Sequence, residues 1–350
     1  MQAVTALVSL MAGDAVSEPA RFIVGTKRFS VTIAHQCSGY QGIGLIWVFL
    51  GTYLWLFRRA FRFPRALLLL PLGTVLVWLA NTARIVALIV IGTWVSPAIA
   101  LGGFHSYSGW LLFCAVALAL AAVARRARFF AAAAPPAERR DNPTAAYLAP
   151  LAAGIGASML TGAFSAGGPD ALYPLRVVAA GGALWLFRRE YRGIRWTASW
   201  TAIAAGAVVF ALWIVLEPSR PDAAAAVPAA LMGVPAGVTA AWFAFRVLGS
   251  VVTVPLAEEL AFRGYLTLRL IAADFETVPF GRFSWLSFLG SSLLFGAMHN
   301  RLLAGTLAGA VYTLVLYRRG ELADPIVAHA TTNAMLAAYV LATGTWSLWS

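Results

Sequence analysis

Residues 257–266 read AEELAFRGYL and lie inside the apolar run 250–271, so three ionisable side chains, Glu258, Glu259 and Arg263, stand in a hydrophobic segment. Ionisable groups within a membrane span are costly and usually face a polar cavity in which they find a partner. Glu259 and Arg263 are four residues apart, so they share a helical face and can pair. Glu258 points about 100° away around the helix. It therefore remains available to accept a proton from water.

The composition of the whole chain is that of a membrane protein. Of 350 residues, 61% are hydrophobic and 11% are charged, whereas about a quarter of a soluble domain is charged. A spanning helix needs about 20 apolar residues. We therefore expect an all-α, polytopic transmembrane helical bundle of about eleven spans in two modules.

The positive charge is arranged for a membrane. The formal net charge is +12, and the arginines cluster in the short segments 58–65, 125–140 and 188–195 between apolar runs. Short basic loops of this kind are typical of the cytoplasmic side. The expected partner of this charge is the lipid bilayer and not nucleic acid, and we expect a multi-pass protein of the bacterial inner (cytoplasmic) membrane.

The apolar runs predict three spans in a first module and eight in a second. They cover residues 42–57, 66–91, 107–124, 146–165, 172–187, 197–216, 229–248, 250–271, 285–299, 301–317 and 324–344. If the spans alternate from a cytoplasmic loop 188–195, Arg318 and Arg319 lie outside, against the positive-inside rule. One of the last five spans is therefore re-entrant, merged or miscounted. The predicted domains are a membrane module 1–125, a charged, proline-containing cytoplasmic linker 126–145 and a second module 146–350.

Two later helices of the second module supply partners for the glutamates. FGAMH ends at His299, and HATTN places His329 and Asn333 four residues apart on one face. Glu258 and His299 could hold and deprotonate a water molecule, while His329 and Asn333 could donate hydrogen bonds to the oxyanion formed on a peptide carbonyl. One Glu and two His are also a known zinc ligand set, but the HExxH spacing is absent. We therefore expect neither metal nor another cofactor.

The order EExxxR, FxxxH and HxxxN on successive apolar helices resembles the CPBP (Abi, type II CAAX endopeptidase) family of glutamate intramembrane proteases. The resemblance covers about residues 146–345. It implies that Glu258 and His299 activate water, that His329 and Asn333 stabilise the oxyanion, and that Glu259 and Arg263 support the site.

The first module carries a second set of reactive side chains. HQCSGYQG contains Cys37, NTARI contains Arg84, and GGFHSYSGW contains His105. The predicted topology brings all three to the non-cytoplasmic membrane face. A neighbouring positive charge would favour the thiolate of Cys37, which is the nucleophile. Arg84 could stabilise an oxyanion or bind a substrate carboxylate.

These three stretches, within residues 35–125, resemble the exosortase/archaeosortase family of membrane cysteine transpeptidases. Their fusion to a CPBP protease resembles the exosortase E/protease proteins. The resemblance implies membrane-anchored protein substrates with a VPEID-type C-terminal sorting signal, which is cleaved and transferred to a cell-surface acceptor. It also implies several spans before the nucleophile, whereas 36 residues precede Cys37, so we expect an N-terminally short module.

Two alternatives remain open at this point. A non-enzymatic transporter or immunity protein could use Glu258 and the histidines as a proton or ion relay. The first module could also be only a membrane anchor for the protease.

Overall fold

The computed structural model describes residues 1–13, 15–34, 39–132, 142–165, 170–217, 233–299 and 301–349. The chain forms two compact units. The first comprises Met1–Arg140 and Met159–Gly168, and the second comprises Asp141–Ser158 and Pro169–Ser350. Cys37 lies outside the described residues.

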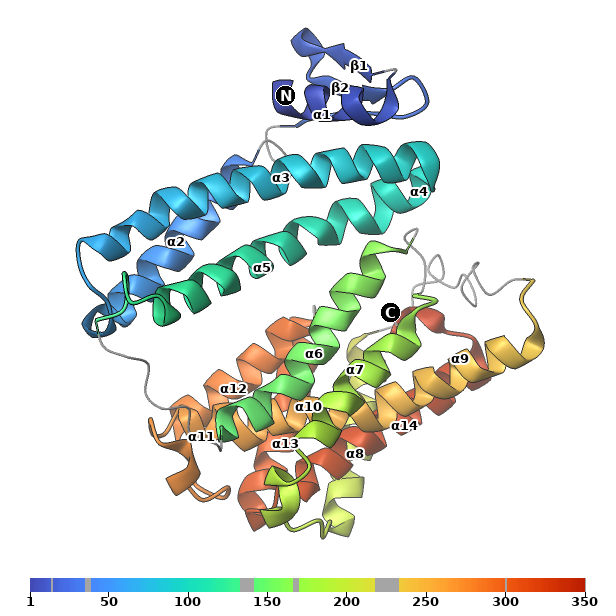
Figure 1. Ribbon diagram of the computed structural model, residues 1–350. Coiled ribbons are helices and arrows are strands. Elements are labelled where there is room, and N and C mark those ends of the chain that lie inside the picture. Colours follow the sequence, from blue (N-terminus) through green and yellow to red (C-terminus); the bar gives the residue numbers. More distant parts are fainter. Residues whose placement is uncertain are drawn as a thin grey trace. The chain divides into compact units, whose positions relative to one another are not determined.

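Three apolar helices form the body of the first unit (Figure 1). They are α2 (Tyr40–Leu56), α3 (Leu69–Trp94) and α5 (His105–Arg126), in agreement with the spans expected near 42–57, 66–91 and 107–124. Their shared core is built from aliphatic side chains of all three helices, among them Leu50, Leu69 and Leu120, each at most 2% exposed. The predicted bundle is therefore present in this unit.

The loops at one end of this bundle meet through the backbone. The Arg62 N–H donates to the Phe130 carbonyl at 2.7 Å, and the Ala132 N–H donates to the Ala60 carbonyl at 2.9 Å. The arginine-rich segment after α2, which includes the 3₁₀ turns Arg58–Ala60 and Arg65–Leu68, thus lies beside the arginine-rich segment after α5. Both basic loops occupy one end of the unit, as the positive-inside rule predicts.

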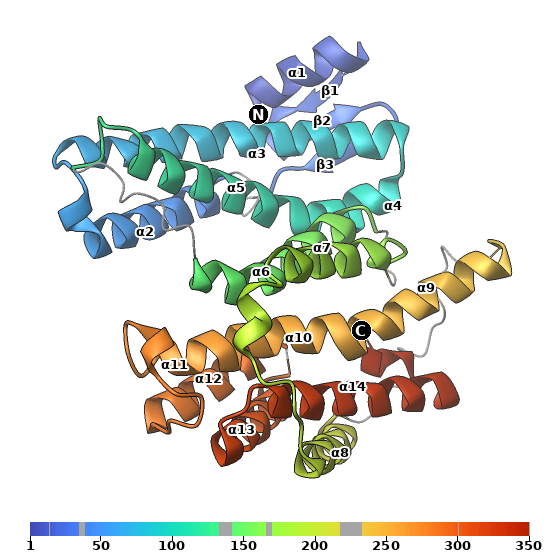
Figure 2. The same cartoon turned by 60° about the horizontal axis from the view of Figure 1, so that its bottom comes forward.

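A small antiparallel sheet, which the hydropathy pattern does not predict, packs beside α3 (Figure 2). Its order is β1 (Ala15–Glu18), β2 (Ile23–Thr26), β3 (Ser30–Thr32), with the turn Pro19–Arg21 between β1 and β2. Val24 of β2 is fully buried against Ile85 and Ile89 of α3, together with the helix α1 (Gln2–Ala12). Strands this short, with few alternating apolar residues, give little signal in a sequence.

Short helical turns join α3 to α5 in the first unit. They are α4 (Pro97–Ile99), capped by the Ser96 hydroxyl, and the π-helical turn η5 (Ala100–Phe104). The turn η5 ends directly before His105. A π-helical turn adds a residue to the helical repeat and is often found at functional sites.

The second unit is a bundle of apolar helices. They are α6 (Pro143–Ala163, whose last turn belongs to the first unit), α7 (Tyr173–Leu186), α8 (Trp200–Leu216), α9 (Ala236–Leu248), α10 (Val254–Glu259), α11 (Thr267–Arg269), α12 (Trp285–Met298), α13 (Leu302–Arg319) and α14 (Ala323–Thr343). Short 3₁₀ turns lie at Glu190–Gly193, Phe275–Thr277 and Trp346–Trp349. The all-α membrane bundle is confirmed.

Five helices of the described residues are long and apolar enough to cross a membrane. They are Arg65–Trp94, Pro97–Arg126, Pro143–Ala163, Ala236–Arg269 and Ala323–Thr343. The fourth runs continuously through α9, α10 and α11 as one 34-residue helix (Figure 2). The spans expected at 229–248 and 250–271 are therefore merged into one helix, which is one of the three alternatives that the position of Arg318 and Arg319 left open.

Two π-helical segments lie within this long helix, η9 (Gly249–Thr253) and η10 (Leu260–Leu266). Pro255 follows the first segment and has no N–H to donate to the preceding turn. The six residues of α10 between the two π segments end at Glu258 and Glu259. The glutamates thus stand where the helix changes its winding on both sides.

Helices α12 and α13 approach closely because glycine faces glycine. A Cβ on Gly296 would lie 2.3 Å from the Thr306 hydroxyl, and a Cβ on Gly305 would lie 2.8 Å from the Gly296 Cα. Small residues allow this kind of close contact between helices in a membrane. The contact holds His299, at the end of α12, against the bundle.

Candidate active sites

Glu258 and His299 form the first pair of the second unit. Glu258 Oε2 lies 3.4 Å from His299 Nε2, and the side chains are 10% and 23% exposed. His299 Nδ1 lies 2.8 Å from the Phe295 carbonyl. Because a carbonyl can only accept, Nδ1 carries the proton, and Nε2 is the nitrogen that faces the carboxylate. Glu258 Oε2 is buried and has no hydrogen-bond partner among the described residues. It is an acceptor that a water molecule can satisfy.

Glu259 forms a separate buried cluster with Arg263 and His329. One carboxylate oxygen, Oε1, lies 3.2 Å from Arg263 Nη1 and 2.9 Å from His329 Nδ1. Glu259 and Arg263 are both 0% exposed. Arg263 Nη2 donates to the Gly309 carbonyl at 2.8 Å. The i, i+4 pair expected from the sequence is thus present, and it also contacts His329.

Aromatic rings fix the two imidazoles. Phe295 lies between them, with its ring centroid 4.4 Å from that of His299 and 5.7 Å from that of His329. Tyr312 stacks on His329 at 4.9 Å with an interplanar angle of 18°. The Tyr312 hydroxyl is held in turn by Thr332 at 2.8 Å. Motif reading did not single out Tyr312, because its role follows from the packing of α13 on α14 and not from spacing along the chain.

Asn333 lies one turn beyond His329 on α14. Its Nδ2 donates to the Ser250 carbonyl in η9 at 2.8 Å. An amide nitrogen carries two hydrogens, so one remains after this bond. The bond ties Asn333 to the long helix that carries Glu258.

Trp213 of α8 is a neighbour that sequence reasoning missed. Its ring meets that of His299 edge to face at 6.3 Å. Its Nε1 is buried without a hydrogen-bond partner among the described residues. An apolar helix with two tryptophans, Trp200 and Trp213, gives no sign of such a contact in the sequence.

The charges of the second-unit cluster balance when one imidazole is protonated. Glu258 and Glu259 bring two negative charges, and Arg263 brings one positive charge. Buried charges are tolerated when they are paired. The cluster is therefore neutral with one protonated imidazole. In the part of the chain that the structure describes, no group of three or more His, Cys, Asp or Glu side chains gathers as metal ligands do.

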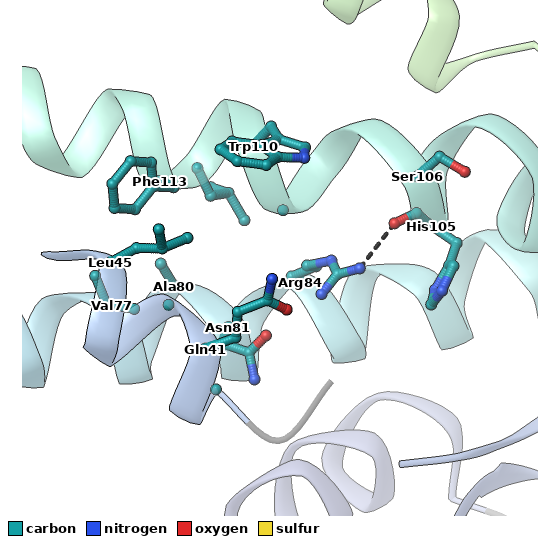
Figure 3. Close-up of a pocket in the computed structure, with 14 residues that line it drawn as sticks. Gln41, Leu45, Val77, Ala80, Asn81, Arg84, His105, Ser106, Trp110 and Phe113 are labelled. Atoms are coloured by element: carbon teal, nitrogen blue, oxygen red, sulfur yellow. Dashed lines mark hydrogen bonds between the residues drawn. The ribbon is translucent and has the colours of Figure 1, made fainter. Parts of the chain in front are cut away.

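Arg84 and His105 meet in the first unit (Figure 3). Arg84 Nη2 donates to the His105 carbonyl at 2.7 Å, and Arg84 Nε donates to the Ser108 hydroxyl at 3.0 Å. These two bonds hold the guanidinium of α3 against the start of α5. Arg84 is thus held against the backbone of His105, and the third expected residue, Cys37, lies outside the described residues.

A cavity of about 420 Å³ opens beside Arg84, between α2, α3 and α5 (Figure 3). Its lining combines the polar Gln41 and Asn81 with apolar side chains such as Trp110. Gly39, which follows the Cys37 stretch, caps α2 with a φ of +95°. That region favours glycine, and a Cβ there would lie 3.3 Å from Asn81 Nδ2. The glycine of HQCSG is therefore required by the backbone at the rim of this cavity.

Two family models match the chain, one in each half. Residues 2–122 match the model described as Transmembrane exosortase (Exosortase_EpsH), and residues 240–335 match the model described as Type II CAAX prenyl endopeptidase Rce1-like. No curated protein and no solved structure matches the chain significantly. With its apolar helices, the chain is a membrane peptidase. It joins an exosortase region to an Rce1-like CAAX protease region, which confirms the fusion that the sequence motifs indicate.

Proposed function

We propose that the second unit hydrolyses peptide bonds within the membrane by means of water activated by Glu258 and His299. The observation that carries the proposal is the buried Glu258–His299 contact of 3.4 Å, with a carboxylate oxygen that lacks a hydrogen bond among the described residues. A water molecule held by this pair can lose a proton to it as the water oxygen attacks a peptide carbonyl. The amine leaves with a proton returned from the same pair.

The oxyanion formed in this step needs donors. His329 is held through Nδ1 by Glu259, so its Nε2 can donate when the ring is protonated. Asn333 has one amide hydrogen beyond its bond to Ser250. Donors of this kind contribute about 3 kcal/mol each to a barrier in known hydrolases. Glu259 and Arg263 orient His329, and Glu258 supplies the negative charge that balances a protonated imidazole in the cluster.

Substitution of Glu258 by Gln tests this proposal. The purified variant should fold as the wild type does and should lose cleavage of a membrane-tethered peptide reporter by at least about 100-fold. Full activity in this variant would overturn the proposed mechanism. Loss of ion or proton flux in proteoliposomes, with no cleavage by the wild type, would instead indicate a relay.

We propose for the first unit a cysteine transpeptidase that acts on membrane-anchored proteins with a VPEID-type C-terminal signal, in a bacterial inner membrane. Cys37 would attack the peptide carbonyl, and the amine side of the substrate would leave with the thiol proton by way of His105. Arg84 would stabilise the oxyanion. An acceptor amine or hydroxyl would then release the acyl group. The support is the cavity between apolar helices that Arg84 and His105 both line, with Arg84 held there by its hydrogen bond to the His105 backbone carbonyl.

A covalent adduct tests this second proposal. A reporter that carries the VPEID-type signal and an apolar tail should form a thioester with the wild type, and the thioester should disappear on treatment with hydroxylamine. Cys37→Ala should form none, and Cys114→Ala is the matched control because Cys114 lies exposed on α5. An adduct that persists in Cys37→Ala would refute the assignment of the nucleophile.

A further inference from the structure

A second cavity, of about 230 Å³, lies next to the first in the N-terminal unit. Arg84 and His105 line both cavities. The second cavity is bounded otherwise by the strand β3 and by the apolar side chains of Ile85, Leu88 and Leu101. Arg84 and His105 therefore lie between two cavities. One is bounded by the strand β3, and the other is bounded by apolar helices.

The strand β3 has an open side at this cavity. It is the last strand of the sheet, and its Val31 is paired with Val24 of β2. The Ile33 N–H also donates toward β2, to the Phe22 carbonyl at 2.8 Å. Because successive residues of an antiparallel strand direct their backbone groups to opposite sides, those of Ser30 and Thr32 face away from β2.

The open side offers backbone groups for pairing. No strand of the described residues pairs there. The Thr32 carbonyl accepts the Ala34 N–H at 3.0 Å, which leaves the Thr32 N–H and both backbone groups of Ser30. Ser30 and Thr32 are exposed, whereas Val31 between them packs toward α3. This row of donors and acceptors along an apolar floor is what an extended polypeptide needs as a template.

We propose that the open edge of β3 binds the extended segment of the substrate before the scissile bond as a fourth strand, an inference that rests on the transpeptidase function proposed above. A peptide is the ligand that supplies backbone donors and acceptors at the strand repeat. Strand addition of this kind takes affinity from the main chain and specificity from pockets for alternate side chains. Ile85, Leu88 and Leu101 provide such an apolar pocket.

The two cavities then divide the substrate by its chemistry. The extended segment lies along β3, and the apolar segment after the cut enters the larger cavity, which is lined by Leu45, Val77 and Phe113. The bond between the two segments passes Arg84 and His105, which both cavities share. Specificity for a short motif followed by an apolar tail follows from this arrangement.

Replacement of Thr32 by Pro tests the pairing, because it removes the outward N–H and leaves every β2–β3 hydrogen bond. Proline is tolerated on edge strands. Since one backbone hydrogen bond changes an equilibrium constant by about 2- to 12-fold, we expect KM for the VPEID-type reporter to rise in that range with kcat unchanged. Ala15→Pro, on the outer edge of β1, is the matched control and should leave KM at the wild-type value.

Disulfide trapping supplies a test that leaves the backbone intact. In a Cys37→Ala, Cys114→Ala background, Ser30→Cys is paired with single cysteines at successive positions of the reporter. Because side chains alternate along a strand, crosslinks should form at every second reporter position. Ser17→Cys, on the outer strand β1, should give none.

The outcomes separate the inference from the function on which it rests. A wild type that forms no thioester with the reporter overturns both. A wild type that cleaves, with Thr32→Pro at the wild-type KM or with crosslinks equal at all reporter positions, overturns the strand proposal alone. Raised KM with alternating crosslinks supports it.

Discussion

The same substitution should have different effects at the two adjacent glutamates of the long helix. At Glu258 it should lower activity, and at Glu259 it should lower stability. Glu258→Gln and Glu259→Gln each remove one negative charge at nearly constant volume. Among the described residues, Glu258 has one ion-pair contact, at 3.4 Å to His299, and the oxygen in that contact, Oε2, has no hydrogen bond. Glu259 is 0% exposed and holds both Arg263 and His329. Glu258→Gln therefore removes the carboxylate proposed to activate water. Glu259→Gln instead breaks an ion pair that stabilises the fold.

The expected magnitudes follow from these contacts. Removal of one partner of a buried ion pair costs about 3 to 5 kcal/mol, which is a large share of the about 5 to 15 kcal/mol that stabilises a typical protein. Glu259→Gln should lower the free energy of unfolding by that amount, because Arg263 stays buried without its carboxylate. Glu258→Gln should change it by less than about 1 kcal/mol and should lower kcat by about 10²- to 10⁴-fold.

Two measurements on protein in mild detergent decide the question. Titration with SDS, followed by the fluorescence of the 13 tryptophans, gives the free energy of unfolding. Cleavage of a membrane-tethered peptide reporter gives kcat. The double variant Glu259→Gln, Arg263→Met removes both charges and should recover most of the lost stability, since buried pairs can be replaced by apolar residues at little cost.

Equal stability losses in the two single variants would refute this reasoning. So would an active Glu258→Gln, or a double variant no more stable than Glu259→Gln alone. In the last case the stabilisation by Glu259 would have to come from His329 and not from Arg263.

Three further changes test other contacts. Asn333→Ala should lower kcat of the same reporter by about 10²-fold while the protein stays folded, and an unchanged kcat would remove Asn333 from the site. Arg84→Lys keeps the charge but cannot reproduce both the bond to Ser108 and the bond to the backbone of α5. The rate of thioester formation should therefore fall. A wild-type rate would show that charge alone suffices. Gly296→Val would put a Cβ 2.3 Å from the Thr306 hydroxyl and should separate α12 from α13. Size-exclusion chromatography should show a loss of folded protein. A monodisperse variant would contradict the close packing.

Hydropathy predicted most of this fold because a bilayer leaves few choices. Apolar runs of sufficient length must be helices, and the expected spans from 285 to 344 match α12, α13 and α14 closely. The spans expected at 229–248 and 250–271 left a break at Gly249, yet this residue lies in a π-helical turn of one helix. A hydropathy profile does not detect a change from α-helical to π-helical winding, because the backbone stays hydrogen-bonded and the segment stays apolar.

The candidate sites divide along similar lines. Spacing along single helices predicted the Glu259–Arg263 pair, and the resemblance of the motifs joined Glu258 to His299, which the structure places in contact. Tyr312 and Trp213 approach the histidines from other helices. Such contacts depend on which helices neighbour one another, and a single sequence does not state that.

The 34-residue helix also sets the depth at which the second unit would work. Arg269, where the helix ends, lies eleven positions after Glu258, which is about 16 Å at 1.5 Å per residue. That distance is about half of a 30 Å hydrocarbon layer. If Arg269 marks the lipid boundary, a peptide bond meets Glu258 near the bilayer midplane, and the substrate has to leave water before it can be cut. The choice of substrate would then depend first on how readily a segment partitions into lipid and unwinds there, and only afterwards on recognition of its side chains.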